Sequence, residues 1–173
     1  MDAIECILTR RSVRKFLDKE VEQEKIEKII ECGKFAPSAL NRQTYHFTVI
    51  KNKEWLANVS KFFKKRRLNP LYNVTYGAPI LIVVSDSDIR FAEKNASAAI
   101  ENIMLAAHAL GLGTCWINQL SDDDLKDDKE FVNFIEKAGI DIKSKIVGSV
   151  ALGYASEKDI VAKPRKNNNV NFY

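Results

Sequence analysis

Apolar residues recur at helical spacing in two segments near the N-terminus. One stripe consists of Ile4, Ile7 and Leu8, and the other consists of Ile26, Ile29, Ile30 and Phe35. Spacings of three and four residues place such side chains on one face of an α-helix, so the pattern predicts two amphipathic helices. The second helix must end near Pro37, because proline lacks the N–H of a helix interior and the residue before it avoids helical torsions. Residues 10–16 are therefore predicted to connect the two helices, and residues 36–43 to form a loop.

Further along the chain, segments rich in β-branched and aromatic residues alternate with helical patterns. Strands are predicted at residues 45–50, 79–84, 113–117 and 146–154, and helices at residues 55–63 and 92–110. The strand at 79–84 has no polar side, which is typical of an interior strand covered on both faces. A further helix is predicted from an N-cap at Ser121, through an apolar stripe, to Gly139.

These elements predict an α+β fold, in which a central mixed sheet of four to five strands is wrapped by helices. The length of 173 residues fits one domain with a real core, and no shift in composition marks a second one. Residues 156–173 differ from the rest, because they contain charges, a proline and three consecutive asparagines but few apolar residues. We expect this tail to be disordered or laid against another surface.

The charge and the cysteine content narrow the class of protein. A formal net charge of +4 is a mild excess that does not require a polyanionic partner. Cys6, Cys32 and Cys115 lie far apart without a CxxC pair, so we expect reduced, mostly buried thiols and neither disulfides nor a metal site. The N-terminus lacks the pattern of a signal peptide, and no apolar run approaches the length of a bilayer span. The sequence therefore predicts a soluble, cytoplasmic protein without a membrane partner.

Two basic clusters lie near opposite ends of the chain. The basic heptad, residues 10–16, supplies Arg10, Arg11, Ser12 and Arg14, and the C-terminal cluster supplies Lys163 and Arg165. Arginine offers a planar fork of donors that matches phosphate oxygens, lysine adds a point charge and serine adds a short hydroxyl donor. The two clusters predict one shared phosphate, as a phosphorylated cofactor requires. The alternative is a solvated surface run, which is what most runs of charge are.

Residues for side-chain catalysis are scarce. His46 falls in a strand pattern and His108 on an apolar helix, which argues against a histidine triad or a multi-histidine metal site. Residues 111–113 begin like a dinucleotide fingerprint, but they follow a helix and lack the third glycine, and the chain contains no Walker A sequence. The sequence thus predicts phosphate binding by an enzyme whose cofactor performs the chemistry.

Four segments together resemble the FMN-dependent nitroreductase family, in its small form. They are the basic heptad, residues 36–43, residues 105–117, and the ending formed by residues 153–154 and 163–165. They occur in the family's order and span nearly the whole chain. The resemblance implies a nitroreductase-like fold and a homodimer with two FMN molecules at its interface, each held by both subunits. It also implies that the tail, residues 156–173, crosses onto the partner subunit.

The resemblance assigns roles to individual residues. It assigns the FMN phosphate to Arg10, Arg11 and Ser12, joined by Lys163 and Arg165. Residues that reach the flavin ring from the other subunit are Pro37, Ser38, Leu40 and Asn41. Residues of the same subunit at the flavin are Arg14, near the ribityl chain or pyrimidine, and Trp116, Ile117, Asn118 and Gln119, near the N5 and O4 edge. Negative charge develops at that edge on reduction, so backbone amides there are suitable donors.

Three places in the sequence depart from the family's pattern. Leu40 stands where many members have glycine, residues 44–45 replace a common proline-tryptophan pair, and residues 118–119 replace an acidic residue and glycine found in some relatives. These changes predict a pocket wall of different shape and a different contact at N5.

Three functions are consistent with the sequence. The first is an FMN oxidoreductase that uses NADH or NADPH to reduce electron-poor acceptors, such as nitroaromatics or quinones, in a ping-pong cycle. The second is a flavin-binding protein that stores, senses or degrades FMN without general reductase turnover. The third is a nucleic-acid-binding domain that uses the basic heptad and residues 64–67 as a basic patch. The third lacks aromatic interleaving and a known binding motif, so we expect no nucleic-acid partner.

Overall fold

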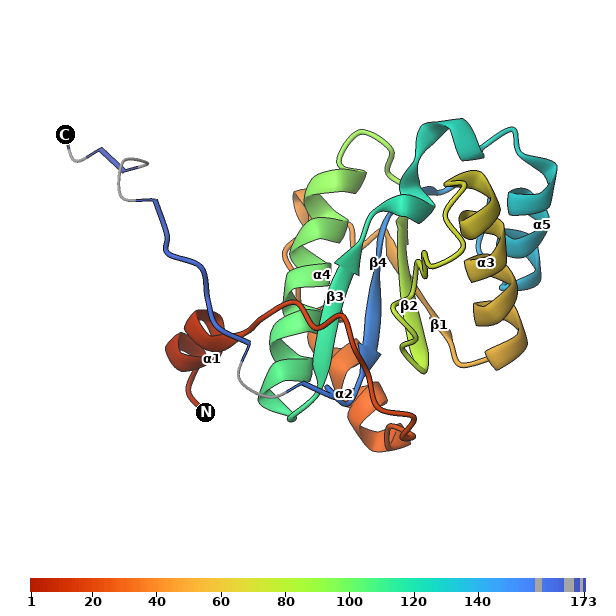
Figure 1. The fold of residues 1–173 in the computed structure, drawn as a ribbon. Helices are drawn as coiled ribbons and strands as arrows, with labels where there is room; N and C mark the ends of the chain where they lie inside the picture. The colour runs from red at the N-terminus through yellow and green to blue at the C-terminus, as the bar shows by residue number, and fades with distance from the viewer. Residues whose placement is uncertain (158–159, 167–169, 172) are drawn as a thin grey trace.

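The computed structural model describes residues 1–157, 160–166, 170–171 and 173, and its centre is a four-stranded sheet (Figure 1). The strands are β1 (Tyr45–Ile50), β2 (Ile80–Asp86), β3 (Gly113–Ile117) and β4 (Lys145–Gly153). Their order across the sheet is β1-β2-β4-β3, and every neighbouring pair is antiparallel. The expected mixed sheet is therefore antiparallel in its four strands. A parallel pairing occurs at one isolated bridge, between Ser12 and Thr114 on the outer edge of β3.

Helices cover both faces of the sheet (Figure 1). They are α1 (Ala3–Thr9), α2 (Gln23–Lys34), α3 (Lys53–Arg66), α4 (Ala92–Ala109) and α5 (Lys129–Lys137). The side chains of α2 and α4 pack on one face, and those of α3 and α5 pack on the other. Among the described residues, no helix is both long and apolar enough to span a bilayer.

The strand β2 explains why two helical layers form. Alternate side chains of a strand point to opposite faces, and here both sets are apolar. Ile80, Ile82 and Val84 belong to the core cluster with α2 and α4, while Leu81 and Val83 belong to the cluster with α3 and α5. The interior strand predicted from the continuous apolar run is thus confirmed, and it joins the two halves of the core.

One predicted helix start is wrong. Ser121 does not cap a helix: its hydroxyl donates to the carbonyl of Asn118 at 2.6 Å, and two short 3₁₀ turns, Gln119–Ser121 and Asp123–Leu125, follow each other here. The helix α5 begins later, after Asp128, whose carboxylate accepts hydrogen bonds from the amides at positions 130 and 131. An aspartate that caps these amides satisfies donors that the start of a helix leaves unpaired.

The two ends of the chain are the parts least covered by the domain. On α1, Cys6 is buried, whereas Ile4, Ile7 and Leu8 are 67%, 56% and 66% exposed. The predicted apolar stripe of α1 therefore faces away from its own domain. Residues 160–166 extend away from the sheet (Figure 1). Parts of the predicted tail, at 158–159, 167–169 and 172, lie outside the described residues.

Candidate functional site

The basic heptad runs along the free edge of β3 (Figure 1). The amide of Val13 donates to the carbonyl of Thr114 at 2.8 Å, and Phe16 forms a second bridge with Ala155. Gly113 allows this close approach, because a Cβ at that position would lie 2.7 Å from a methyl group of Val13. The backbone of the heptad is therefore held against the sheet, while the side chains of Arg14 and Lys15 are exposed.

Arg10 and Arg11 present unpaired donors at this edge. Arg10 Nε lies 3.6 Å from a carboxylate oxygen of Glu101, and Arg11 Nη1 donates to the carbonyls of Leu8 and Arg10 at 2.8 and 2.7 Å. Within the described part of the chain, Arg10 Nη1 and Arg11 Nε are buried and have no hydrogen-bond partner. Buried polar atoms are almost always paired, so these nitrogens indicate an acceptor supplied from outside the described residues.

A histidine also lies close to the two arginines. His108, on α4, shares a hydrogen bond of 2.9 Å with the hydroxyl of Thr9. Burial lowers the pKa of His108, and the charges of Arg10 and Arg11 lower it further. A histidine kept neutral in this way does not add to the repulsion between the guanidinium groups. The edge of β3 near α1 is thus suited to an anion.

Arg14 lies further along the heptad and is exposed. Its guanidinium carbon is 5.9 Å from the ring centroid of Tyr76, which is within cation–π range. Tyr76 has a φ of 55°, in the left-handed region. Such backbone strain in a residue other than glycine is concentrated at functional sites. Sequence reasoning missed Tyr76, and the adjacent Gly77 was the available signal for a tight turn.

The predicted loop after α2 is sharply folded. Leu40, Asn41 and Gln43 all have φ between 53° and 54°, although left-handed torsions favour glycine. The hydroxyl of Ser38 accepts a hydrogen bond from the amide of Gln43 at 2.9 Å. Leu40 is 81% exposed, and Pro37 is exposed as well. The loop therefore presents its tip outward.

This loop and the heptad lie at opposite edges of the sheet. Residues 37–43 lead directly into β1, which is one edge strand, whereas the heptad pairs with β3, which is the other. One chain does not bring these two groups of predicted site residues together. A contact between both of them and one ligand requires a second copy of the chain.

Trp116, Ile117 and Asn118 mark the end of β3. Ile117 is buried in the core, Asn118 is exposed and Trp116 is half-buried. The indole Nε1 of Trp116 is buried without a hydrogen-bond partner among the described residues, and it lies over Gly148, where a Cβ would be 2.5 Å away. Trp116 and Asn118 line an open hollow of about 340 Å³ with residues of α4 and β4.

The C-terminal cluster lies on the described part of the tail. Lys163 and Arg165 are both exposed, and residues 160–166 extend away from the sheet (Figure 1). A phosphate site shared by the two basic clusters stays a prediction.

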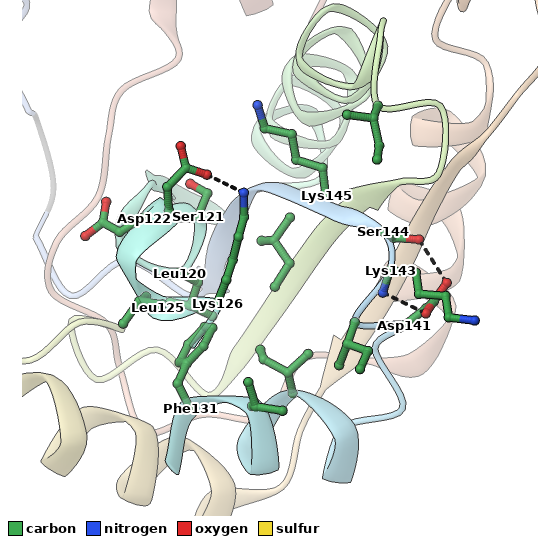
Figure 2. Close-up of a pocket in the computed structure, with 16 residues that line it drawn as sticks. Leu120, Ser121, Asp122, Leu125, Lys126, Phe131, Asp141, Lys143, Ser144 and Lys145 are labelled. Atoms are coloured by element: carbon green, nitrogen blue, oxygen red, sulfur yellow. Dashed lines mark hydrogen bonds and ion pairs between the residues drawn. The ribbon is translucent and has the colours of Figure 1, made fainter. Parts of the chain in front are cut away.

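A separate cavity of about 430 Å³ lies between the 3₁₀ turns, α5 and the start of β4 (Figure 2). Its floor includes Leu120, Leu125 and Phe131, and Lys126 and Lys145 stand at its rim. Lys126 and Lys145 are paired with Asp123 and Glu93, each at 2.6 Å. The lining contains none of the residues predicted to contact a cofactor.

An antiparallel sheet between two helical layers, with buried arginine donors at one edge, defines an α+β protein equipped to bind an anionic ligand. The chain belongs to the nitroreductase family, because the model described as "Nitroreductase family" matches residues 7–154. The family expected from the four sequence segments is thereby confirmed.

Three relatives illustrate the similarity. A protein from Methanothermobacter thermautotrophicus is 39% identical over 121 residues, which cover 67% of this chain and 60% of that protein. One from Archaeoglobus fulgidus is 32% identical over 164 residues, which cover 91% of this chain and 88% of that protein. Both are provisionally named NADH dehydrogenase/NAD(P)H nitroreductase. The crystal structure of a nitroreductase with bound FMN from Bacteroides fragilis is 31% identical, has a TM-score of 0.90 and covers the whole of both chains.

Proposed function

We propose that this protein is an FMN-dependent oxidoreductase that uses NADH or NADPH to reduce electron-poor acceptors, such as nitroaromatics or quinones, in a ping-pong order. The observation that carries the proposal is the pair of buried guanidinium nitrogens, on Arg10 and Arg11, that lack partners among the described residues. A phosphate accepts several charge-assisted hydrogen bonds and fits these donors. The FMN bound to the similar nitroreductase from Bacteroides fragilis supports the identity of the phosphate carrier.

The residues at the edge of β3 bind different parts of FMN. Arg10, Arg11 and Ser12 hold the phosphate, and Arg14 lies along the ribityl chain or the pyrimidine. Lys163 and Arg165 complete the phosphate site when the tail is placed by dimerisation. Trp116 and the backbone from Ile117 to Gln119 face the N5 and O4 edge of the ring, where backbone N–H donors stabilise developing negative charge.

The same proposal requires a homodimer. The apolar side chains of Ile4, Ile7 and Leu8 are exposed on α1, and contiguous apolar surface of this kind marks an interaction site. A second copy also brings the loop with Pro37, Ser38, Leu40 and Asn41 to the ring held at the other subunit's β3 edge. Two equivalent sites result, each built from both subunits.

When bound, FMN supplies hydride transfer between the nicotinamide and the acceptor, so no side-chain acid or base is assigned to that chemistry. The side chains of this protein bind the phosphate, orient the ring and set the electrostatic potential at its edge. One open face serves the nicotinamide and the acceptor in turn, which gives the ping-pong order. A cytoplasmic location remains a prediction from the sequence.

The test is an absorption spectrum of the purified protein loaded with FMN, recorded before and after anaerobic addition of NADH or NADPH. Flavin bands that bleach rapidly, and return when a nitroaromatic or a quinone is added, support the proposal. Bands that persist overturn the reductase function and favour a protein that stores, senses or degrades FMN. No retained flavin after incubation with FMN overturns both flavin functions.

A further inference from the structure

A buried carboxylate lies at the end of β2, far from the arginines. Asp86 is 0% exposed, and its Oδ1 accepts a hydrogen bond from the amide of Asp88 at 2.7 Å. Its Oδ2 accepts a hydrogen bond of 3.1 Å from the side-chain amide of Asn95, a residue of α4 that is 3% exposed. Burying a carboxylate is costly unless its oxygens are hydrogen-bonded, so both contacts matter to the fold.

Asn95 is also hydrogen-bonded to the loop after α2. Its Oδ1 accepts a hydrogen bond from the backbone amide of Ala39 at 2.9 Å. The Ala39 N–H fixes the orientation of the Asn95 amide, because it can donate but not accept. The amide oxygen of Asn95 must therefore face Ala39, and its NH₂ group faces the carboxyl group of Asp86. Ala39, Asn95 and Asp86 therefore form a chain of hydrogen bonds with one allowed direction, which we call the Asn95 relay.

The loop that receives the relay is strained. Leu40, Asn41 and Gln43 are held in left-handed torsions, which are unfavourable in residues other than glycine. Such a conformation persists when its surroundings hold it in several places. A second link comes from the loop's Arg42, whose guanidinium lies 3.0 Å from the carboxylate of Asp88.

We propose that Asn95 and Asp86 are positioning residues that hold the loop of residues 38–43 in its strained conformation and thereby shape the wall of the partner's flavin pocket. The effect on the flavin pocket rests on the proposed function, whereas the effect on the conformation of the loop does not. Asp86 supplies an acceptor for the side-chain amide of Asn95, and Asn95 in turn supplies the acceptor that holds the Ala39 amide.

The relay predicts an unusual pattern of loss and rescue. N95D alone places two carboxylates opposite each other, and D86N alone leaves two N–H donors facing each other at one of the links, whichever way the two side-chain amides are turned. The double variant D86N/N95D restores all of the links by exchanging the two groups. The carboxylate moved to position 95 would accept from Ala39 and from the side-chain amide moved to position 86, and the oxygen of that amide would accept from Asp88. A purely steric role for these side chains predicts no such rescue.

The direct measurement is hydrogen exchange of the Ala39 amide, followed by NMR. We expect exchange to be faster by about tenfold or more in N95D and in D86N, as for the loss of a hydrogen bond to a charged or buried group, and to return to the wild-type rate in the double variant. If N95D does not fold, N95S replaces it, because a serine is too short to join both partners. Unchanged exchange in the single variants, or no rescue in the double variant, overturns the inference.

The control for α4 itself is N102D. Asn102 lies on the same helix, and its amide donates to the carbonyl of Cys32 at 3.1 Å, away from the loop. The same substitution there should leave exchange at Ala39 unchanged. An increase equal to that of N95D would show a general loosening of α4 and would overturn the inference.

Kinetics test the consequence for the reaction. In N95D we expect FMN to be retained, while kcat/KM for the acceptor per bound FMN falls by about tenfold and recovers in the double variant. If the two side chains only stabilise the fold, N95D lowers the folded fraction but leaves kcat/KM per bound FMN unchanged. That result would overturn their role in the reaction. If no variant binds FMN but the exchange rescue holds, the proposed function fails and the positioning of the loop stands.

Discussion

The amide of Val13 donates to the carbonyl of Thr114 at 2.8 Å, and this bond fixes the basic heptad to the outer edge of β3. The contact depends on Gly113, which has no side chain to separate the heptad from the strand. The position of the arginines is therefore set by the packing of a glycine and a valine that carry no charge.

The first prediction concerns Gly113→Ala. The added methyl group would lie 2.7 Å from Val13, so the heptad must move outward. We expect FMN affinity to fall by about tenfold, the equivalent of about 1.4 kcal/mol, in a fluorescence titration. Gly111→Ala is the matched control: Gly111 has a φ of 76° and open space around it, so alanine there costs about 1–2 kcal/mol of stability through the backbone. Equal FMN affinities in the two variants would contradict this account.

The second prediction concerns Arg10. Loss of its charge-assisted hydrogen bonds, worth about 1.5–3 kcal/mol, should weaken FMN binding about 10-fold to 100-fold in Arg10→Ala. Combined with Arg165→Ala, it should release FMN from the purified protein. Lys65→Ala removes the same charge from the exposed end of α3 and should bind FMN like the wild type. Unchanged flavin content in the double variant would show that the phosphate lies elsewhere.

The core elements were predictable because burial determines which positions of the sequence are apolar. In β2, apolar side chains at consecutive positions indicated burial on both faces, and the whole strand is buried in the structure. The start of α5 was not predictable in the same way. Ser121 and Asp128 both satisfy the local rules for a cap, and the choice was made by tertiary packing, which buries Leu120 just before Ser121 and Leu125 between Ser121 and Asp128.

The sequence suggested residue types for a candidate site but not their geometry. The arginines of the heptad stood out by composition. That two of their nitrogens are buried and lack partners among the described residues became visible only in the folded structure. The hydrogen bond between Asn95 and Ala39 joins residues 56 positions apart, so no local sequence pattern predicts it. Leu40 adopts a φ of 54°, so the loop takes a left-handed torsion here without a glycine, which its sequence alone did not indicate.

The third prediction concerns α1 and the proposed dimer. Placing a charge on its exposed apolar face, in Ile4→Asp or Leu8→Asp, should weaken dimerisation by about tenfold or more, since burying such a side chain contributes about 1.5–3 kcal/mol. Analytical ultracentrifugation across a concentration series measures the shift towards monomer. Leu71→Asp, at a residue that is 91% exposed in another part of the chain, should leave the association unchanged. A wild-type protein that is monomeric at all concentrations would remove the basis of this prediction and of the shared flavin site.

The last prediction concerns acid stability and the pair formed by Glu22 and Tyr154. The hydroxyl of Tyr154 donates to the carboxylate of Glu22 at 2.7 Å, and this hydrogen bond is the main cause that lowers the pKa of Glu22 from 4.5 to about 2. A lowered carboxyl pKa contributes stability that is fully present above about pH 4.5 and is lost as the pH falls towards 2. Thermal melts of wild type and Tyr154→Phe should therefore differ most above pH 4.5 and converge as the pH approaches 2. Glu24→Gln, at an exposed glutamate in the first turn of the same helix, should keep the wild-type pH dependence. A difference between wild type and Tyr154→Phe that stays constant from about pH 6 to about pH 2 would mean that the tyrosine stabilises the fold by packing and not through the ionised carboxylate.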